Sequence, residues 1–198
     1  MSFDTLLALI AFAFVTSVTP GPNNFMLLAS GVNFGLVRTL PHMLGIGTGF
    51  CSLLLGVGLG LGALLVAFPV LETVLKVAGG SYLLYLAWRI ATSRSMGKGE
   101  ADAARPMRFL EAAAFQWVNP KAWVMAISAM ALYTNADRPV LSVLLVALVF
   151  PVTGFPATSA WAVFGRMLKG WLSDPARLKV FNIAMGLMLA ATLVPLLR

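Results

Sequence analysis

Two short segments place prolines and polar side chains inside apolar stretches, and both are of a type that binds anions. The first is Pro20-Gly21-Pro22-Asn23-Asn24, and the second is Asn119-Pro120-Lys121, with Gln116 just before it. Proline removes a backbone donor and clashes with the carbonyl one turn earlier, so neither segment fits within a continuous helix. Because proline favours the first position of a helix and asparagine caps helix starts, Pro22 and Pro120 are predicted to begin new half-helices.

The chemistry predicted for these two helix starts is the binding of a carboxylate. The first N–H groups of a helix are unpaired and carry about half a positive charge. If the two starts lie close together, their N–H groups form an anion site. Lys121 would add a full charge, and four amides would add neutral hydrogen bonds: Asn23, Asn24, Gln116 and Asn119. The backbone of Pro20, Gly21, Pro22 and Pro120 completes the predicted substrate site.

Lys121 has two interpretations. A lysine near a membrane surface ordinarily extends its ammonium to that surface and has no further role. Lys121, however, follows Arg108 by 13 residues, which is about 20 Å of helix at 1.5 Å per residue. That distance predicts a position near the middle of the membrane, where an ionisable group is a functional candidate.

The composition places these segments in an all-α, polytopic membrane protein. The chain has 198 residues, of which 60% are hydrophobic and only 11% are charged, whereas soluble domains carry about 25% charged residues. The net charge of +7 comes from basic residues at the ends of apolar stretches, where such residues set topology. The charge therefore predicts a lipid bilayer as surroundings and no nucleic-acid partner.

Six apolar stretches approach or exceed the length of about 20 residues that a membrane span needs. They cover residues 3–32, 39–67, 71–92, 109–133, 140–164 and 180–197. The whole chain, 1–198, is predicted to be one transport domain with half-repeats 1–92 and 107–198, joined by a cytoplasmic loop at 93–106. An odd number of spans inverts the second half, and the two broken helices are the first and the fourth. Paired breaks in inverted halves are a pointer to the binding site of a transporter.

The distribution of basic residues predicts the orientation. Most of them flank the loops after spans three and five, and these loops are placed in the cytoplasm by the positive-inside rule. They are Arg89, Arg94, Lys98, Arg105, Arg108, Arg166, Lys169, Arg177 and Lys179. Both termini are then predicted to lie outside.

The second span carries a stripe of glycines. Gly45, Gly49, Gly56 and Gly60 fall within about 60° of one another on a helix with 3.6 residues per turn. Such a stripe favours close helix packing. The functional alternative is that it lets a neighbouring helix slide and so gates transport.

Three other features remain open between structural and functional roles. His42 either packs at a helix interface or carries a proton. Cys51 is predicted to be a small packing residue. Pro151 and Pro156, with Gly154 between them, predict a kink that lines a cavity opposite the second span.

Enzyme chemistry finds little support in the sequence. One cysteine and one histidine exclude a two-cysteine redox relay and a histidine-rich metal site. His42 has no serine-hydrolase partner motif, and no H-E-x-x-H motif is present. The sequence therefore predicts no catalytic residues, no metal and no cofactor. A non-transporting scaffold would explain the glycine stripe, but not the two breaks or Lys121.

The motifs resemble those of the lysine exporter (LysE/RhtB-type) translocators. The similarity rests on Thr19-Pro20-Gly21-Pro22-Asn23, on residues 76–88 and on Val118-Asn119-Pro120-Lys121-Ala122. The doubled Asn23-Asn24, residues 87–93 and residues 115–119 are most similar to the cysteine and O-acetylserine exporter branch.

The resemblance implies a secondary exporter of amino acids or close derivatives in the bacterial inner membrane, driven by the proton gradient. No acidic residue lies deep in a predicted span, so the expected substrate is a small neutral amino acid of the cysteine, O-acetylserine, threonine or homoserine kind. Exporters of basic amino acids or of other small metabolites and drugs are the alternatives. A homodimer through an exposed face of small residues is a further expectation.

Overall fold

The computed structural model describes residues 1–93 and 105–194. These residues fold into helices, and none of them forms a strand. The α-helices are α1 (Phe3–Val18), α2 (Pro22–Phe34), α3 (Leu36–Gly56), α4 (Gly62–Ala67), α5 (Pro69–Thr92), α6 (Phe109–Gln116), α7 (Pro120–Tyr133), α8 (Pro139–Leu168) and α9 (Pro175–Ala191). A π-helical stretch, Val57–Leu61, follows α3, and a 3₁₀ turn, Trp171–Ser173, precedes α9.

Proline marks where most of these helices begin. Helices α2, α5, α7, α8 and α9 each have proline in the first turn, where its missing N–H has no helical partner to lose. Asn119 caps α7, and its side chain accepts from the Lys121 N–H. The predicted half-helix starts at Pro22 and Pro120 are therefore confirmed.

Three single helices are long and apolar enough to cross a membrane: Leu36–Leu61, Pro69–Thr92 and Pro139–Leu168. Helices α1 and α2 qualify together as one span that bends by 58° at the first break. The predicted fourth span, 109–133, has the predicted bounds and the predicted break, and the sixth begins a few residues earlier than predicted, at Pro175. The fourth is divided into an 8-residue α6 and a 14-residue α7, because Pro120 cannot continue the preceding helix. The sixth has 17 helical residues.

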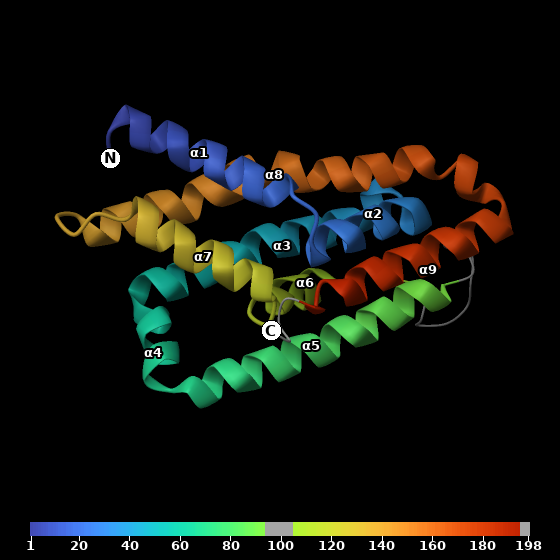
Figure 1. Ribbon diagram of the computed structural model, residues 1–198. Coiled ribbons are helices and arrows are strands. Elements are labelled where there is room, and N and C mark those ends of the chain that lie inside the picture. The colour runs from blue at the N-terminus through green and yellow to red at the C-terminus, as the bar shows by residue number, and fades with distance from the viewer. Residues whose placement is uncertain (94–104, 195–198) are drawn as a thin grey trace.

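The second predicted span, 39–67, is not one straight helix. Gly60 adopts a φ of 113°, a conformation that residues with a Cβ rarely adopt, and α4 turns away from the direction of α3 beyond it (Figure 1). A Cβ at Gly60 would meet nothing within 4 Å. Gly60 thus corrects the predicted packing stripe: it forms the kink, and no described helix approaches the place where its Cβ would lie.

The other glycines of the stripe do allow close packing. A Cβ at Gly45 or Gly49 would collide with the backbone of α6, at Phe109 and Ala113, and one at Gly56 would lie 3.1 Å from the Trp117 ring. The α2–α8 crossing is built in the same way. There a Cβ at Gly31 would collide with the Ala162 carbonyl, and one at Gly165 with the Leu28 carbonyl.

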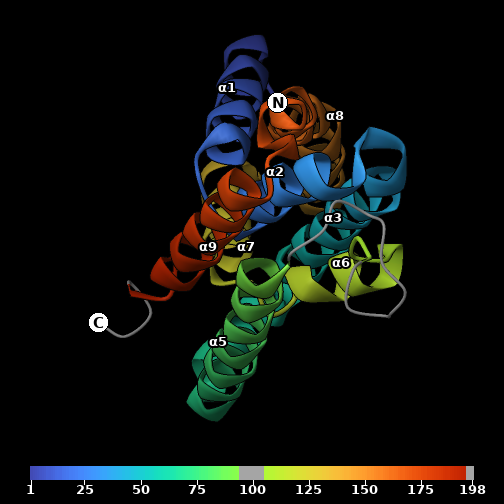
Figure 2. The same ribbon diagram turned by 90° about the vertical axis from the view of Figure 1, so that its right-hand side faces the viewer.

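The two predicted halves form one bundle in which corresponding helices run in opposite directions (Figures 1 and 2). Helices α1 and α2 pack on α8, α6 and α7 pack on α3, and α5 packs on α9. The largest buried cluster joins α1, α3, α7 and α8, with Phe50 and Phe150 at its centre. The division into repeats stays a prediction, and 94–104, most of the predicted cytoplasmic loop, lies outside the described residues.

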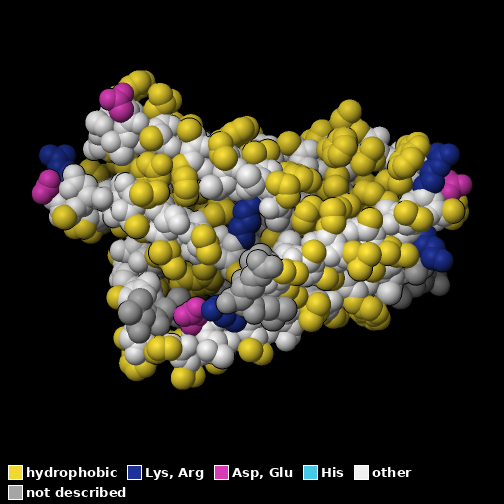
Figure 3. All heavy atoms as spheres, in the orientation of Figure 1, with side chains coloured by type: hydrophobic (Ala, Val, Ile, Leu, Met, Phe, Trp, Pro, Cys, Tyr) yellow, Lys and Arg dark blue, Asp and Glu magenta, His cyan; other side chains and the backbone are white. Residues whose placement is uncertain are grey.

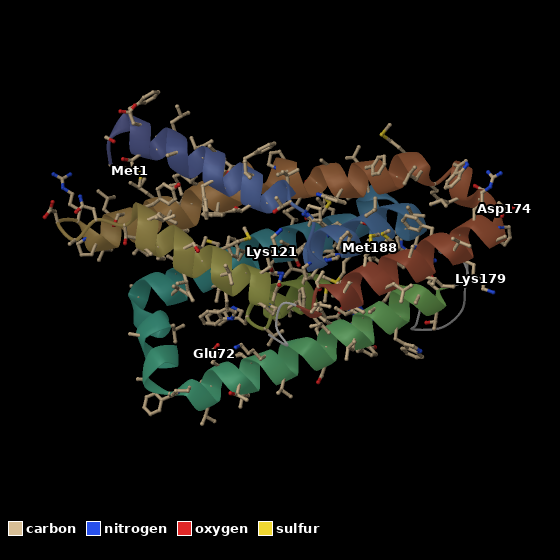
Figure 4. All side chains as sticks on the ribbon, viewed as in Figure 1. Met1, Glu72, Lys121, Asp174, Lys179 and Met188 are labelled. Carbon is tan, nitrogen blue, oxygen red and sulfur yellow. The ribbon has the colours of Figure 1, made fainter. Side chains whose placement is uncertain are left out.

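Apolar side chains cover the middle of the molecule, and charged side chains gather mainly towards its two ends (Figure 3). A basic patch interrupts the apolar middle at the place where Figure 4 labels Lys121, and a basic and an acidic patch lie side by side where it labels Glu72. This distribution is that of a multi-pass membrane protein with lipid around its middle.

Two adjacent glycines of α5 give a matched test of the packing. A Cβ at Gly79 would collide with the carbonyl of Val118, beside the second break, whereas a Cβ at Gly80 would make only an ordinary 3.8 Å contact with Leu193. Gly79→Ala is therefore expected to destabilise the protein by about 1–3 kcal/mol through overpacking. Gly80→Ala is expected to be neutral or to add up to about 1 kcal/mol through helix propensity. Thermal unfolding in detergent measures both, and equal melting temperatures for the two variants would contradict this packing.

Candidate functional site

The end of α1 exposes backbone carbonyls in the middle of the protein, and each has a hydrogen-bond partner. A helix end leaves its last carbonyls without intrahelical donors, and hydrocarbon offers none in their place. Side chains from within the break and from α2, α7 and α8 supply them. The pairs are Thr16 O with Thr19 Oγ1 (2.8 Å), Ser17 O with Asn24 Nδ2 (2.9 Å), Val18 O with Trp161 Nε1 (3.1 Å) and Thr19 O with Lys121 Nζ (2.7 Å).

Lys121 joins the two breaks directly. Its ammonium donates to Thr19 O at 2.7 Å and to Thr19 Oγ1 at 2.9 Å, and it lies 3.4 Å from Pro20 O. These acceptors belong to the C-terminal end of α1, which carries the negative end of the helix dipole and favours a cation. Figure 4 shows Lys121 about midway between the end that carries Met1 and the end that carries Asp174 and Lys179. The ammonium thus lies in the middle of the bundle, and its depth in the membrane stays a prediction.

Gly21 makes room for the lysine. A Cβ at Gly21 would lie 2.7 Å from Cδ of Lys121, closer than two carbons pack. The backbone of Gly21 is extended, with φ and ψ both 178°, so any residue could adopt it. A larger residue here would displace the Lys121 side chain, because its aliphatic stem passes against the Cα of Gly21.

Asn23 and Gln116 form a second link between the breaks. Asn23 Nδ2 donates to Gln116 Oε1 at 2.8 Å, and Gln116 Nε2 donates back to Asn23 Oδ1 at 3.2 Å. Gln116 is fully buried and also donates to Ala112 O within α6. The paired amides hold the start of α2 against the end of α6.

Asn24 leaves an acceptor unpaired. Its Nδ2 donates to Ser17 O at 2.9 Å and to Thr19 O at 2.7 Å, and two carbonyl partners fix which side-chain atom is the nitrogen. Oδ1 is buried and receives no hydrogen bond from the described residues. The backbone N–H groups of Asn23 and Asn24, in the first turn of α2, also donate to none of the described residues. A buried polar group without a partner costs about 1–3 kcal/mol, so this corner is built for a ligand or for water.

Asn23 and Asn24 line a cavity of about 60 Å³ between α1, α2, α3, α7 and α8. One water needs about 10–15 Å³, so the cavity has room for several waters or a small molecule. Its polar lining comes from Thr16, Ser17, Asn23, Asn24, Gln116, Asn119, Lys121 and Thr158, and its apolar lining includes Met43, Ile46, Phe50, Met125, Phe150 and Phe155. Among the described lining residues Lys121 carries the only charge, and none is acidic.

The structure brings most of the predicted site residues together. Gly21, Asn23, Asn24, Gln116, Asn119 and Lys121 line this one cavity, as do Pro151 and Gly154 of α8. Pro20, Pro22, Pro120 and Pro156 do not line it. The sequence predicts Lys121 as a charge for the substrate and gives it no protein partner. In the structure its ammonium pairs with the end of α1.

Sequence reasoning missed the partners that close the first break. Thr19 supplies two acceptors to Lys121, and Trp161 of α8 donates to Val18 O. A tryptophan in an apolar span needs an acceptor for its N–H, and this need is the feature of the sequence that could have identified Trp161 as a partner. Only the tertiary structure shows where that acceptor lies.

The profile of the family described as "LysE type translocator" matches residues 14–198. Curated relatives include the "Cysteine/O-acetylserine efflux protein" of Escherichia coli strain K12, which is 30% identical over 191 residues, or 96% of this chain and 95% of the relative. The protein of the same name from Shigella sonnei strain Ss046 has the same identity and coverage, and that of Shigella flexneri is 30% identical over 90% of each chain. No solved structure matches the chain.

Proposed function

The chain belongs to the LysE type translocator family, and we propose that it exports small neutral amino acids or their close derivatives in exchange for protons. Membership in the family makes it a translocator and not an enzyme, and its apolar helices make it a multi-pass protein of the inner membrane. The substrate, the site and the coupling are our proposal.

The observation that carries the proposal is the complementarity between the cavity and an amino-acid zwitterion. The unpaired N–H groups of Asn23 and Asn24 and the ammonium of Lys121 are donors suited to a carboxylate. The unpaired Oδ1 of Asn24 is an acceptor suited to the α-ammonium. A carboxylate would take the lysine donor that now makes only the 3.4 Å contact with Pro20 O, and the two shorter bonds to Thr19 would remain.

The lining of the cavity supports a neutral side chain on the substrate. A lysine or arginine side chain would bring a second cation close to Lys121, and none of the described lining residues is an acid that could offset it. Buried unpaired charge is costly. The apolar wall of Phe50, Phe150 and Phe155 suits a short, uncharged side chain.

The relatives' printed names narrow the proposed substrate. Proteins named for efflux of cysteine and O-acetylserine share 30% identity with this chain over nearly its whole length. We therefore expect substrates of this size and polarity, with threonine and homoserine as the next candidates.

We also propose the orientation of export. Arg166, Lys169, Arg177 and Lys179 flank the connection between α8 and α9, at the end where Figure 4 labels Asp174 and Lys179. The positive-inside rule places that end in the cytoplasm. Both termini then lie outside.

The first test uses Lys121→Met, which keeps the aliphatic stem against Gly21 and removes the charge. A hydrogen bond to a charged group contributes about 1.5–3 kcal/mol, so export is expected to fall about 10- to 100-fold. Cells loaded with a panel of amino acids, including cysteine, O-acetylserine, threonine and lysine, are followed for release of each compound.

The matched control is Lys76→Met, because Lys76 is an exposed lysine whose ion pair with Glu72, at 2.7 Å, lies on the surface of α5. It is expected to export as the wild type does. Wild-type export by a normally inserted Lys121→Met protein would refute the site. Release of none of the panel by the wild type would refute the proposed function.

The second test labels single cysteines in a Cys51→Ser background. Ala136→Cys, in the turn between α7 and α8, is expected to react with an impermeant thiol reagent in intact cells. Ser173→Cys, between α8 and α9, is expected to react only after the cells are opened. The reverse pattern would invert the proposed orientation.

A further inference from the structure

A second cavity lies further along α2, towards the basic end of the molecule. It has about 70 Å³ and is bounded by α2, α3, α5 and the residues just before α6. Its lining includes Ser30, Asn33, His42, Arg89 and Arg105. None of these residues lines the first cavity.

His42 is the buried polar side chain of this cavity that is left without a partner. It is 2% exposed, and neither Nδ1 nor Nε2 makes a hydrogen bond with the described residues. Its buried polar neighbours in the lining are paired: Ser30 Oγ lies 2.7 Å from Thr39 Oγ1, and Asn33 Nδ2 lies 3.1 Å from Asn182 Oδ1. An imidazole has two nitrogens that need partners in either protonation state. Water in the cavity would meet that need.

The charged groups around His42 come from several elements. Arg89 of α5 and Arg105 before α6 line the same cavity, and Glu111 of α6 is paired with Arg105 at 2.5 Å. Helix α2 presents only neutral side chains here, α8 has Arg166 as its sole charged residue, and Arg38 of α3 is exposed and stacks on Phe34. Lys121 of α7 lines the other cavity. His42 is the one histidine of the chain, and histidine is the side chain that ordinarily changes charge near neutral pH.

The two cavities share their walls. Helix α2 contributes Asn23 and Asn24 to the first and Ser30 and Asn33 to the second. On α3, His42 lines the second cavity while its neighbours Met43 and Ile46 line the first. A movement of α2 against α3 would therefore change both cavities together, which is what coupling of two sites requires.

We infer that the second cavity is the proton site of the exporter and that His42 is the group that carries the coupling proton. The inference rests on the proposed function, and it assigns the residue that drives export. In the step towards the cytoplasm an N–H bond of the imidazolium breaks, its electron pair stays on the ring nitrogen, and the proton passes to water in the cavity. Substrate in the first cavity and the proton on His42 in the second then both act on the arrangement of α2 and α3.

The test compares two transport modes of the purified protein in liposomes. Wild-type protein is expected to drive substrate uphill when a pH gradient is imposed, and to exchange labelled for unlabelled substrate without one. His42→Gln is expected to lose about tenfold or more of the gradient-driven transport, in the usual range of coupling between sites. Exchange should survive at a measurable rate, because His42 lies outside the substrate cavity. The pH dependence of substrate exchange should disappear in this variant.

Ser159→Ala is the matched control. Ser159 Oγ is also buried and has no hydrogen-bond partner among residues 1–93 and 105–194. The residue lines neither cavity, so both transport modes should persist. Gradient-driven transport by His42→Gln at the wild-type rate would overturn the inference. Loss of both modes in a folded His42→Gln protein would also overturn it, because that result indicates a structural role.

A second measurement needs no variant. With ¹⁵N-labelled histidine, nuclear magnetic resonance follows His42 alone, and linkage requires that substrate shift its titration midpoint if proton and substrate binding are coupled. An unchanged midpoint at saturating substrate would overturn the inference. Wild-type protein that exchanges amino acids but ignores the pH gradient would overturn it too, and would leave amino-acid export standing. Wild-type protein that moves no amino acid would refute the proposed function itself.

Discussion

The carbonyl groups at the end of α1 are the constraint on which the rest of this structure depends. A helix that stops in the middle of a membrane leaves polar backbone groups where lipid provides no partner. Here the lysine of the opposite half provides it, because Lys121 Nζ lies 2.7 Å from Thr19 O. The bond links α7 to α1, and the stem of the lysine packs against Gly21. It also holds a cation in the middle of the bundle by the negative end of a helix dipole. The same side chain thus meets the structural need of the break and supplies the cation that the proposed function uses.

The rest of the bundle positions the two helix starts around that contact. Helix α6 lies against Gly45 and Gly49 of α3, and α2 lies against Gly165 of α8. Each broken helix of one half therefore packs at backbone distance on the long helix of the other half. Close packing leaves few voids in a protein interior, so the two cavities that remain are candidates for binding sites. Both border α2 and α3, and this pair of helices is the natural element through which one site affects the other.

Local features of the sequence were predictable, and tertiary partners were not. Pro22 and Asn119-Pro120 act through their own backbone chemistry, so the helix starts could be placed from sequence. The helical rise placed Lys121 about 20 Å along the chain from Arg108, near the middle of the fourth predicted span. Its bond to Thr19 spans 102 residues, and no periodicity encodes it. At Gly60 the spacing led to a wrong prediction. It fitted a packing stripe, but glycine is needed there because the backbone has a positive φ. That Asn24 Oδ1 lacks a partner follows only from the tertiary structure, in which Asn24 Nδ2 donates to the carbonyls of Ser17 and Thr19.

The central claim is that the cavity between the two helix starts recognises the carboxylate of an amino acid. The most direct measurement is equilibrium binding of an exported amino acid and of its carboxamide to the purified protein. The carboxamide keeps the size and the α-ammonium and loses the negative charge. The account predicts that the carboxamide binds about tenfold or more weakly, which corresponds to about 1.4 kcal/mol. Equal affinity for the two compounds would contradict it.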